Sequence, residues 1–269
     1  MRSWLSRKNP PGKPQVVVES QSADDGAVKT FWEHLDDLRG TVVKSVIALA
    51  ITFHLALAFS NRIMAVLTWP LRRATDHPQD FLLSLNVTDS FVLSVKLAFY
   101  VGIVLAAPAI LYFIGKFVLP ALRPQEKRML WPGFAAGTIL FITGVVSCFL
   151  LIVPQTLHAF IQASHWLGIE PRWTIDSYIG FVTQFTLMTG LTFEIPLVVL
   201  ILVRLGVLSY ATVRKGRKFF VMLAFVIAAF LAPPDPLSMV LMALPLLVLF
   251  EITIWLSWFS ERKRQRQMR

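Results

Sequence analysis

Long apolar runs alternate with short polar segments along most of this chain. Six runs are evident, at residues 41–60, 91–115, 131–153, 178–203, 219–232 and 237–250. A hydrocarbon core roughly 30 Å thick needs about 20 helical residues to cross it, so the first four runs predict membrane-spanning helices. The last two are shorter, so they span only with local bilayer thinning, or form a re-entrant pair.

Composition supports this interpretation. Of the 269 residues, 55% are hydrophobic and 16% are charged, and the mean hydropathy is +0.63. This is too apolar for a soluble domain of the same length. We therefore predict an all-α integral membrane protein with six transmembrane helices, of which the last two are short.

Basic residues mark one side of the membrane. Segments 1–44, 116–128, 204–218 and 262–269 hold most of the 26 Lys and Arg residues, and the alternate loops hold few. By the positive-inside rule, both termini are then cytoplasmic. The net charge of +10 indicates orientation and contact with anionic lipids, and does not indicate nucleic-acid binding.

Three regions follow from these patterns. Residues 1–28 contain no apolar segment and predict a disordered cytoplasmic tail, not a cleaved signal peptide. Residues 29–260 form the predicted six-helix membrane domain, and residues 261–269 a basic cytoplasmic tail. At the start of the domain, "TFWEHLDDLRG" predicts an amphipathic interfacial helix that bends into the first span.

Two outer loops, at 61–90 and 154–177, are long enough to form a cap. The spans that follow them begin alike, with "TDSFVLSV" and "IDSYIGFV". Asp89 and Asp176 are predicted to cap these helices, and Pro108 and Pro196 to kink them. The shared plan is typical either of an old parallel repeat or of coincidence, since both features are common in membrane helices.

Glu194 is the most unusual residue, because it lies beside Pro196 within an apolar run, "LTFEIPLVV". An ionised side chain at the bilayer centre costs at least roughly 3 kcal/mol, and such residues mark polar paths, proton relays or partner sites. A glutamate that is protonated or paired for packing alone is the alternative. Glu251 can reach water near the end of the last helix, and Asp235 precedes Pro236 as an N-cap would.

Catalytic motifs are not found in the sequence. It has no metalloprotease, hydrolase or phosphate-loop signature, its five histidines are scattered, and Cys148 is alone. We therefore expect no enzyme activity, no cofactor and no metal site.

Five segments, in order, carry a resemblance to a known family. They are "HLDDLR" before the first span, "FVLPALRPQEKR" after the second, "TFEIP" in the fourth, and then "LAPPDPLS" and "LFEI". Together, over about residues 30 to 260, they resemble TatC, the signal-peptide receptor subunit of the twin-arginine protein translocase.

The resemblance implies a signal-peptide-binding site on the cytoplasmic side. Its residues are Asp37, followed by Arg39, and the loop acid Glu126, with Phe117 close to the peptide path. Carboxylates suit this role because guanidinium groups form paired hydrogen bonds with them that lysine cannot reproduce. Without the resemblance, the same acids read as solvated surface charges.

This chain departs from the family pattern in two places. Asp37 stands where the family has glutamate, and Asp36 beside it is a second acceptor. Gly40 and Thr41 follow Arg39, where the family often has basic residues. The spacing favours Asp37 as the residue that faces the arginines.

The resemblance also implies an intramembrane partner site. Pro70 matches an outer-loop proline, Glu194 the family's intramembrane glutamate, and Asp235 the acid between the last two helices. Implied partners are twin-arginine signal peptides of folded cargo, single-span TatA-like and TatB-like subunits, and further copies of this chain, in the bacterial cytoplasmic (inner) membrane. A proton-coupled secondary transporter that uses Glu194, and a structural scaffold, are the competing classes.

Overall fold

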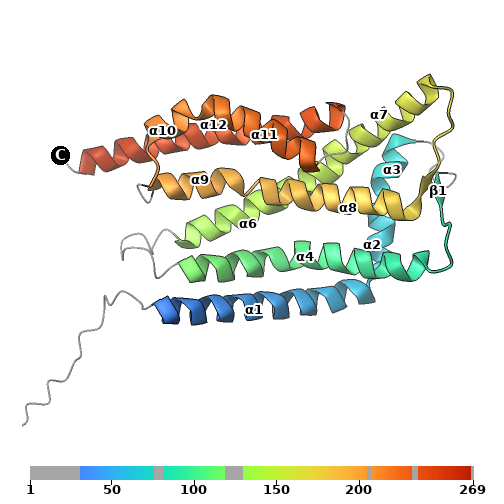
Figure 1. Ribbon diagram of the computed structural model, residues 1–269, viewed down its shortest axis with the longest axis horizontal. Helices are drawn as coiled ribbons and strands as arrows, with labels where there is room; N and C mark the ends of the chain where they lie inside the picture. Colours follow the sequence, from blue (N-terminus) through green and yellow to red (C-terminus); the bar gives the residue numbers. More distant parts are fainter. Residues whose placement is uncertain (1–30, 76–80, 119–129, 205–206, 232–235, 268–269) are drawn as a thin grey trace, which may run out of the picture.

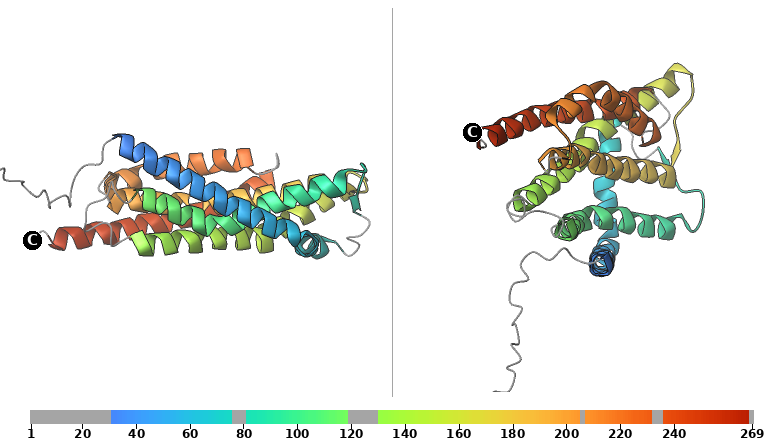
Figure 2. Two further views of the ribbon diagram at one scale, coloured as in Figure 1. Left: turned by 90° about the horizontal axis from the view of Figure 1, so that it is seen from below. Right: turned by 60° about the vertical axis from the view of Figure 1, so that its left-hand side comes forward.

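A computed structural model of the protein describes residues 31–75, 81–118, 130–204, 207–231 and 236–267. In this part of the chain, nearly all regular structure is helical. The long helices lie side by side, with their axes along the longest dimension of the molecule (Figures 1 and 2). They are α1 (Phe31–Ala58), α4 (Asp89–Val118), α6 (Leu130–Ser147), α7 (Val153–Trp166), α8 (Ile175–Thr192), α9 (Ile195–Arg204), α11 (Arg217–Leu231) and α12 (Pro236–Gln267).

Short elements connect these helices. They are α2 (Ser60–Leu67), α3 (Trp69–Ala74), β1 (Leu82–Leu83), the π-helical turn η3 (Cys148–Ile152), β2 (Trp173–Thr174) and α10 (Tyr210–Lys215). The first turn of α1 and the last turns of α12 lie at one end of the bundle, and α2, α3, β1 and β2 lie toward the other, which we call the capped end (Figure 1).

Five helical segments of the described chain are long and apolar enough to cross a bilayer. They are Trp32–Ala58, Asp89–Phe117, Pro132–Trp166, Ile175–Val203 and Pro236–Trp258. The protein is therefore a multi-pass, all-α membrane protein. Helix α11 has 15 residues, about 22 Å at 1.5 Å per residue, so a sixth span stays a prediction.

The last helix is longer than the apolar run that predicted it. The run at 237–250 forms the first part of α12, which continues to Gln267. The predicted start of a basic tail at residue 261 thus falls within this helix. The predicted tail at 1–28 lies outside the described residues.

The predicted interfacial helix is not a separate element. Residues 31–58 form one uninterrupted helix, so the bend expected after "HLDDLR" is not observed. Helix α1 packs along α4, where the Thr52 hydroxyl donates to the carbonyl of Gly102 over 2.8 Å. A Cβ on Gly102 would lie only 3.1 Å from the Phe53 Cα, so this close approach needs glycine.

The core of the capped half lies between α3, α4, η3, α7, α8 and α12. Its most buried side chains include Leu71, Leu97, Leu157, Ile179, Val182 and Met242. A second cluster joins α9, α11 and α12, where the rings of Phe220 and Phe250 stack with their centroids 3.6 Å apart. These clusters attach the short helix α11 to the rest of the bundle.

The two outer loops come together at the capped end, as the prediction of a cap requires. Strands β1 and β2, one from each loop, pair in parallel, and the Trp173 amide donates to the Phe81 carbonyl over 2.8 Å. The buried Tyr178 hydroxyl also donates to the carbonyl of Leu67 over 2.8 Å. Much of the first loop is helical, since α2 and α3 lie within it.

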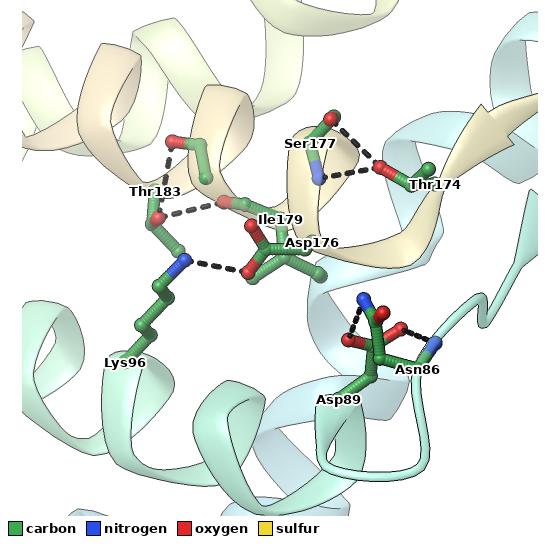
Figure 3. Close-up of polar contacts among 9 residues, drawn as sticks. Asn86, Asp89, Lys96, Thr174, Asp176, Ser177, Ile179 and Thr183 are labelled. Carbon is green, nitrogen blue, oxygen red and sulfur yellow. Dashed lines mark hydrogen bonds and ion pairs between the residues drawn. The ribbon is translucent and has the colours of Figure 1, made fainter.

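The predicted caps of α4 and α8 need correction (Figure 3). Thr174 is the N-cap of α8, and its hydroxyl accepts from the Ser177 amide. Asp176 instead pairs with Lys96 of α4 over 2.6 Å. Asp89 accepts from the Asn86 amide over 2.9 Å, so it orders the turn before α4. Similar sequences at the two helix starts therefore form different contacts.

Candidate functional site

The start of α1 meets the end of α4 at the end of the bundle opposite the cap. His34, in the first turns of α1, stacks on Phe117, in the last turn of α4, with ring centroids 4.4 Å apart and an interplanar angle of 20°. This contact brings the "HLDDLR" segment next to the start of "FVLPALRPQEKR", although more than 80 residues separate them. The first predicted site segment thus lies next to Phe117, the residue at which the second segment begins.

The acids of the first segment lie on different faces of α1. Asp37 follows His34 by three residues, so the two share a helix face, and Asp37 is half-buried. Asp36 and Arg39 are exposed, on faces that do not contain His34. The geometry therefore distinguishes two aspartates that the sequence left as alternatives. Glu126 lies outside the described residues, in segment 119–129, which joins α4 to α6.

The second predicted site lies at a break in the fourth span. Helix α8 ends at Thr192 and α9 begins at Ile195, because Pro196 has no amide hydrogen for the Thr192 carbonyl. The Glu194 amide instead bonds to the Leu191 carbonyl over 3.1 Å, a tighter turn than an α-helix makes. The expected kink is therefore a short interruption, with Glu194 in it.

The Glu194 carboxyl group lies against α6. A Cβ on Gly137 of α6 would lie 3.1 Å from Oε2 and 2.9 Å from the Leu197 Cδ2. Oε1 is buried, and within the described part of the chain it has no hydrogen-bond partner. A buried oxygen without a donor is unfavourable. Glu194 is therefore a half-exposed residue with one carboxyl oxygen that receives no hydrogen bond from the described chain.

Small residues allow this close approach between α6 and the broken fourth span. Gly190 of α8 packs against α6, where an added Cβ would lie 2.6 Å from the Val145 Cγ2. From the α6 side, an added Cβ on Gly144 would lie 2.7 Å from the Phe193 Cγ. The glutamate and the small residues thus belong to one contact between α6 and the broken span.

Other predicted site residues lie away from both groups. Pro70 is buried in the first turn of α3, at the capped end, so it is part of a helix and not of a loop. Asp235 lies outside the described residues, so its role as the N-cap of α12, described from Pro236, stays a prediction. Glu251 pairs with Arg217 of α11 over 2.5 Å, a partner that the sequence did not indicate.

The described side chains also bear on whether the protein has a metal site. No group of three or more His, Cys, Asp or Glu in the described ranges could hold a metal ion. Within the part of the chain that the structure describes, sequence reasoning missed the ion pairs between helices, Lys96 with Asp176 and Arg217 with Glu251. Each joins residues on different helices, so no local spacing could have indicated it.

Known proteins have sequences similar to this one over most of its length. Curated Sec-independent protein translocase proteins TatC that are similar to it include those of Carboxydothermus hydrogenoformans (35% identical; 87% of this chain and 95% of that protein) and Escherichia coli strain K12 (31%; 84% and 87%). The relative from Akkermansia muciniphila is 39% identical over 67% of this chain, which spans only 52% of that longer protein.

Solved structures show the same arrangement of helices. A crystal structure of the twin-arginine translocase receptor TatC superposes with a TM-score of 0.75 at 33% identity, covering 83% of this chain and 99% of that one. A second crystal structure of the receptor gives a TM-score of 0.73. The model of the family described as Sec-independent protein translocase protein (TatC) matches residues 33–245. The chain therefore belongs to the TatC family.

Proposed function

We propose that this protein is the receptor subunit of a twin-arginine translocase in a bacterial cytoplasmic membrane. It binds the paired arginines of signal peptides on folded cargo, at the surface formed by the start of α1 and the end of α4, with Glu126 as the expected second acceptor. Both termini face the cytoplasm, as the distribution of basic residues favours. Binding and release of a peptide need no catalytic group.

The observation that carries this proposal is the position of Asp37. The His34–Phe117 stack holds the first turns of α1 against α4, and Asp37 shares the helix face of His34. The chain continues from the same end of α4 into the segment that contains Glu126. Two carboxylates from separate segments suit two guanidinium groups, because each arginine then receives its own bidentate acceptor.

A photocrosslinking experiment tests this site. A photoreactive amino acid at position 126 is expected to label a twin-arginine signal peptide on the reconstituted full-length protein. Changing both peptide arginines to lysine is expected to reduce labelling about tenfold, the equivalent of about 1.4 kcal/mol. Equal labelling by both peptides would refute the receptor proposal.

The two neighbouring aspartates provide a matched pair of variants. Asp37→Asn is expected to weaken peptide binding about tenfold, in line with the loss of a hydrogen bond to a charged group. Asp36→Asn is expected to change binding less than twofold, because Asp36 is exposed on another face. Peptide titration of both variants with a fluorescent twin-arginine peptide measures the difference. The reverse order of effects would contradict the assignment of Asp37.

Glu194 would act in a later step, as a polar contact for an inserted peptide or for a single-span subunit of the TatA or TatB kind. A half-exposed glutamate with a carboxyl oxygen that has no donor within the described chain supports this role. Glu194→Gln is expected to stop export in vesicles while leaving peptide crosslinking at position 126 unchanged. A variant that loses both activities would instead indicate a general folding defect, and thermal unfolding of the purified variant identifies that case.

Energy for export would come from the transmembrane potential, about 2.3 kcal/mol per charge per 100 mV.

A proton-coupled transporter that uses Glu194 is the alternative function, since the Glu194 Oε1 without a donor also fits it. That alternative predicts uptake of a small solute by the purified protein alone, abolished by Glu194→Gln, with no dependence on Asp37. Peptide binding that depends on Asp37, without solute uptake, favours the receptor.

A further inference from the structure

A cavity of about 590 Å³ opens near the capped end, between α3 and the segment where η3 passes into α7. Its volume is in the range of roughly 300–1,000 Å³ that is typical of small-molecule sites. It is distant from the α1–α4 surface, which lies at the opposite end of the bundle (Figure 1). The described residues that line it are Trp69, Arg73, Leu150, Leu151, Pro154, Gln155 and His158.

The lining has an apolar part and a polar part. Leu150 and Leu151 of η3 are 44% and 66% exposed, and they continue the apolar surface of the long helix. Gln155 and His158, one and two turns further along, are exposed polar side chains on α7. The cavity is therefore amphipathic along the direction of the helix.

A span that enters the hydrocarbon at Pro132 would have this change at the membrane boundary. The span Pro132–Trp166 begins at the end opposite the cap. Twenty residues at 1.5 Å each cover the roughly 30 Å of hydrocarbon, so a span that enters at Pro132 leaves the hydrocarbon near Ile152. The leucines then contact acyl chains, and the polar side chains lie at the depth of the lipid headgroups.

Arg73 supplies the positive charge of the cavity. Its guanidinium carbon lies 5.1 Å from the ring centroid of Trp69, and Trp69 in turn stacks on Phe149 at 6.0 Å. Within the described chain no carboxylate pairs with Arg73. The aromatic support orients the guanidinium group, and its hydrogen-bond donors are available to an anion.

We propose that this cavity binds an anionic phospholipid of the leaflet at the capped end. The Arg73 guanidinium donates paired hydrogen bonds to the headgroup phosphate, the geometry for which arginine is best suited. Gln155 and His158 contact the glycerol and the rest of the headgroup. One acyl chain lies along Leu150 and Leu151.

Two features favour a lipid with net negative charge. The described residues that line the cavity include no carboxylate, so none of these residues offers a counterpart to the ammonium group of a zwitterionic lipid. Arg72 is exposed beside Arg73 and adds a second positive charge. Tryptophan at the cavity is also typical of the membrane interface, where its ring lies at the headgroup level.

The test uses photoactivatable lipids and peptide mapping, because the many basic residues elsewhere would bind anionic lipid without reporting on this cavity. The full chain is reconstituted with phosphatidylglycerol that carries a diazirine on one acyl chain, or with phosphatidylcholine that carries the same group. Phosphatidylglycerol is expected to label residues 150–155 about tenfold more strongly, as a hydrogen-bonded charge pair implies. Equal labelling by the two lipids would overturn the proposal.

Arginine variants supply the matched controls. Arg73→Gln is expected to abolish the preference for phosphatidylglycerol, and Arg73→Lys to retain part of it. Arg62→Gln is expected to leave the preference unchanged, because Arg62 is also exposed and also stacks on an aromatic ring, Phe59, but does not line the cavity. Equal effects of the Arg62 and Arg73 changes to glutamine would overturn the proposal, since they would indicate unspecific attraction.

Soluble glycerol 3-phosphate distinguishes a lipid from a free phosphate compound. At millimolar concentration it is expected to leave labelling unchanged, because it lacks the chain that contacts Leu150 and Leu151. Loss of labelling in its presence would show that the cavity selects a soluble phosphate ester, and would overturn the lipid assignment. The result does not depend on the proposed receptor activity.

Discussion

Packing between α6 and the broken fourth span makes a specific prediction about glycine. An alanine Cβ at Gly144 would lie 2.7 Å from the Phe193 Cγ and 3.1 Å from the Gly190 Cα. The first distance is shorter than real Cβ contacts, so Phe193 or the helix must shift. The Gly190 Cα belongs to the backbone, so it cannot move aside without moving α8. Gly144→Ala must therefore separate α6 from α8 at the turn that contains Glu194.

Gly133 of the same helix provides the control. An added Cβ there has no neighbour within 4 Å. Both changes replace glycine by alanine in α6, so the gain in helix propensity, up to about 1 kcal/mol, enters both variants. The difference between them isolates the packing term, which for overpacked sites is about 1–3 kcal/mol.

Thermal unfolding of the two purified variants, under one scan rate and in one detergent, measures this difference. For a protein of this size each kcal/mol corresponds to about 2–4 °C in Tm, so Gly144→Ala is expected to unfold about 2–12 °C below Gly133→Ala. Equal melting temperatures would show that α6 does not approach Phe193 as closely as the structure indicates. The close contact between α6 and the turn that contains Glu194 would then lose its support.

Two further contacts give measurable expectations. Tyr178→Phe removes the buried hydrogen bond from α8 to α2 and is expected to cost about 1–2 kcal/mol. Tyr100→Phe is the control, because its hydroxyl has no hydrogen bond within the described residues, and an equal loss of Tm in both variants would contradict this reasoning. In the Lys96–Asp176 pair, the Lys96 side chain is 42% exposed and the Asp176 side chain 44% exposed. A double-mutant cycle with Lys96→Met and Asp176→Asn is therefore expected to give a coupling of about 0.5–1 kcal/mol, whereas strictly additive effects would argue against the pair.

Receptor binding and lipid binding can be tested separately, because they use opposite ends of the molecule. The Asp37 surface lies where α1 begins, and Arg73 lies near the cap. Asp37→Asn is expected to leave lipid labelling at residues 150–155 unchanged. Arg73→Gln is expected to leave peptide affinity unchanged. A variant that changes both measurements would indicate coupling through the bundle or loss of fold.

Motif order predicted which acids to examine, but not how they are arranged. Asp36 and Asp37 are adjacent in the sequence, and the motif spacing favours Asp37 for the arginines without placing either aspartate relative to α4. The stack of His34 on Phe117 distinguishes them, since it identifies the face of α1 that meets α4. Peptide binding at Asp37 and Glu126 stays a prediction for the experiments above.

The hydrophobic pattern by itself determined the membrane class, the positions of the long helices and the interruption at Pro196. These depend on local chemistry: an apolar run must bury its backbone polar groups in a helix, and proline removes one hydrogen bond wherever it occurs. Tertiary structure alone decided that Asp176 pairs with Lys96, that Glu251 pairs with Arg217, and that β1 meets β2. Those contacts join residues far apart in the chain, so they depend on how the helices pack, and no short stretch of sequence contains both partners.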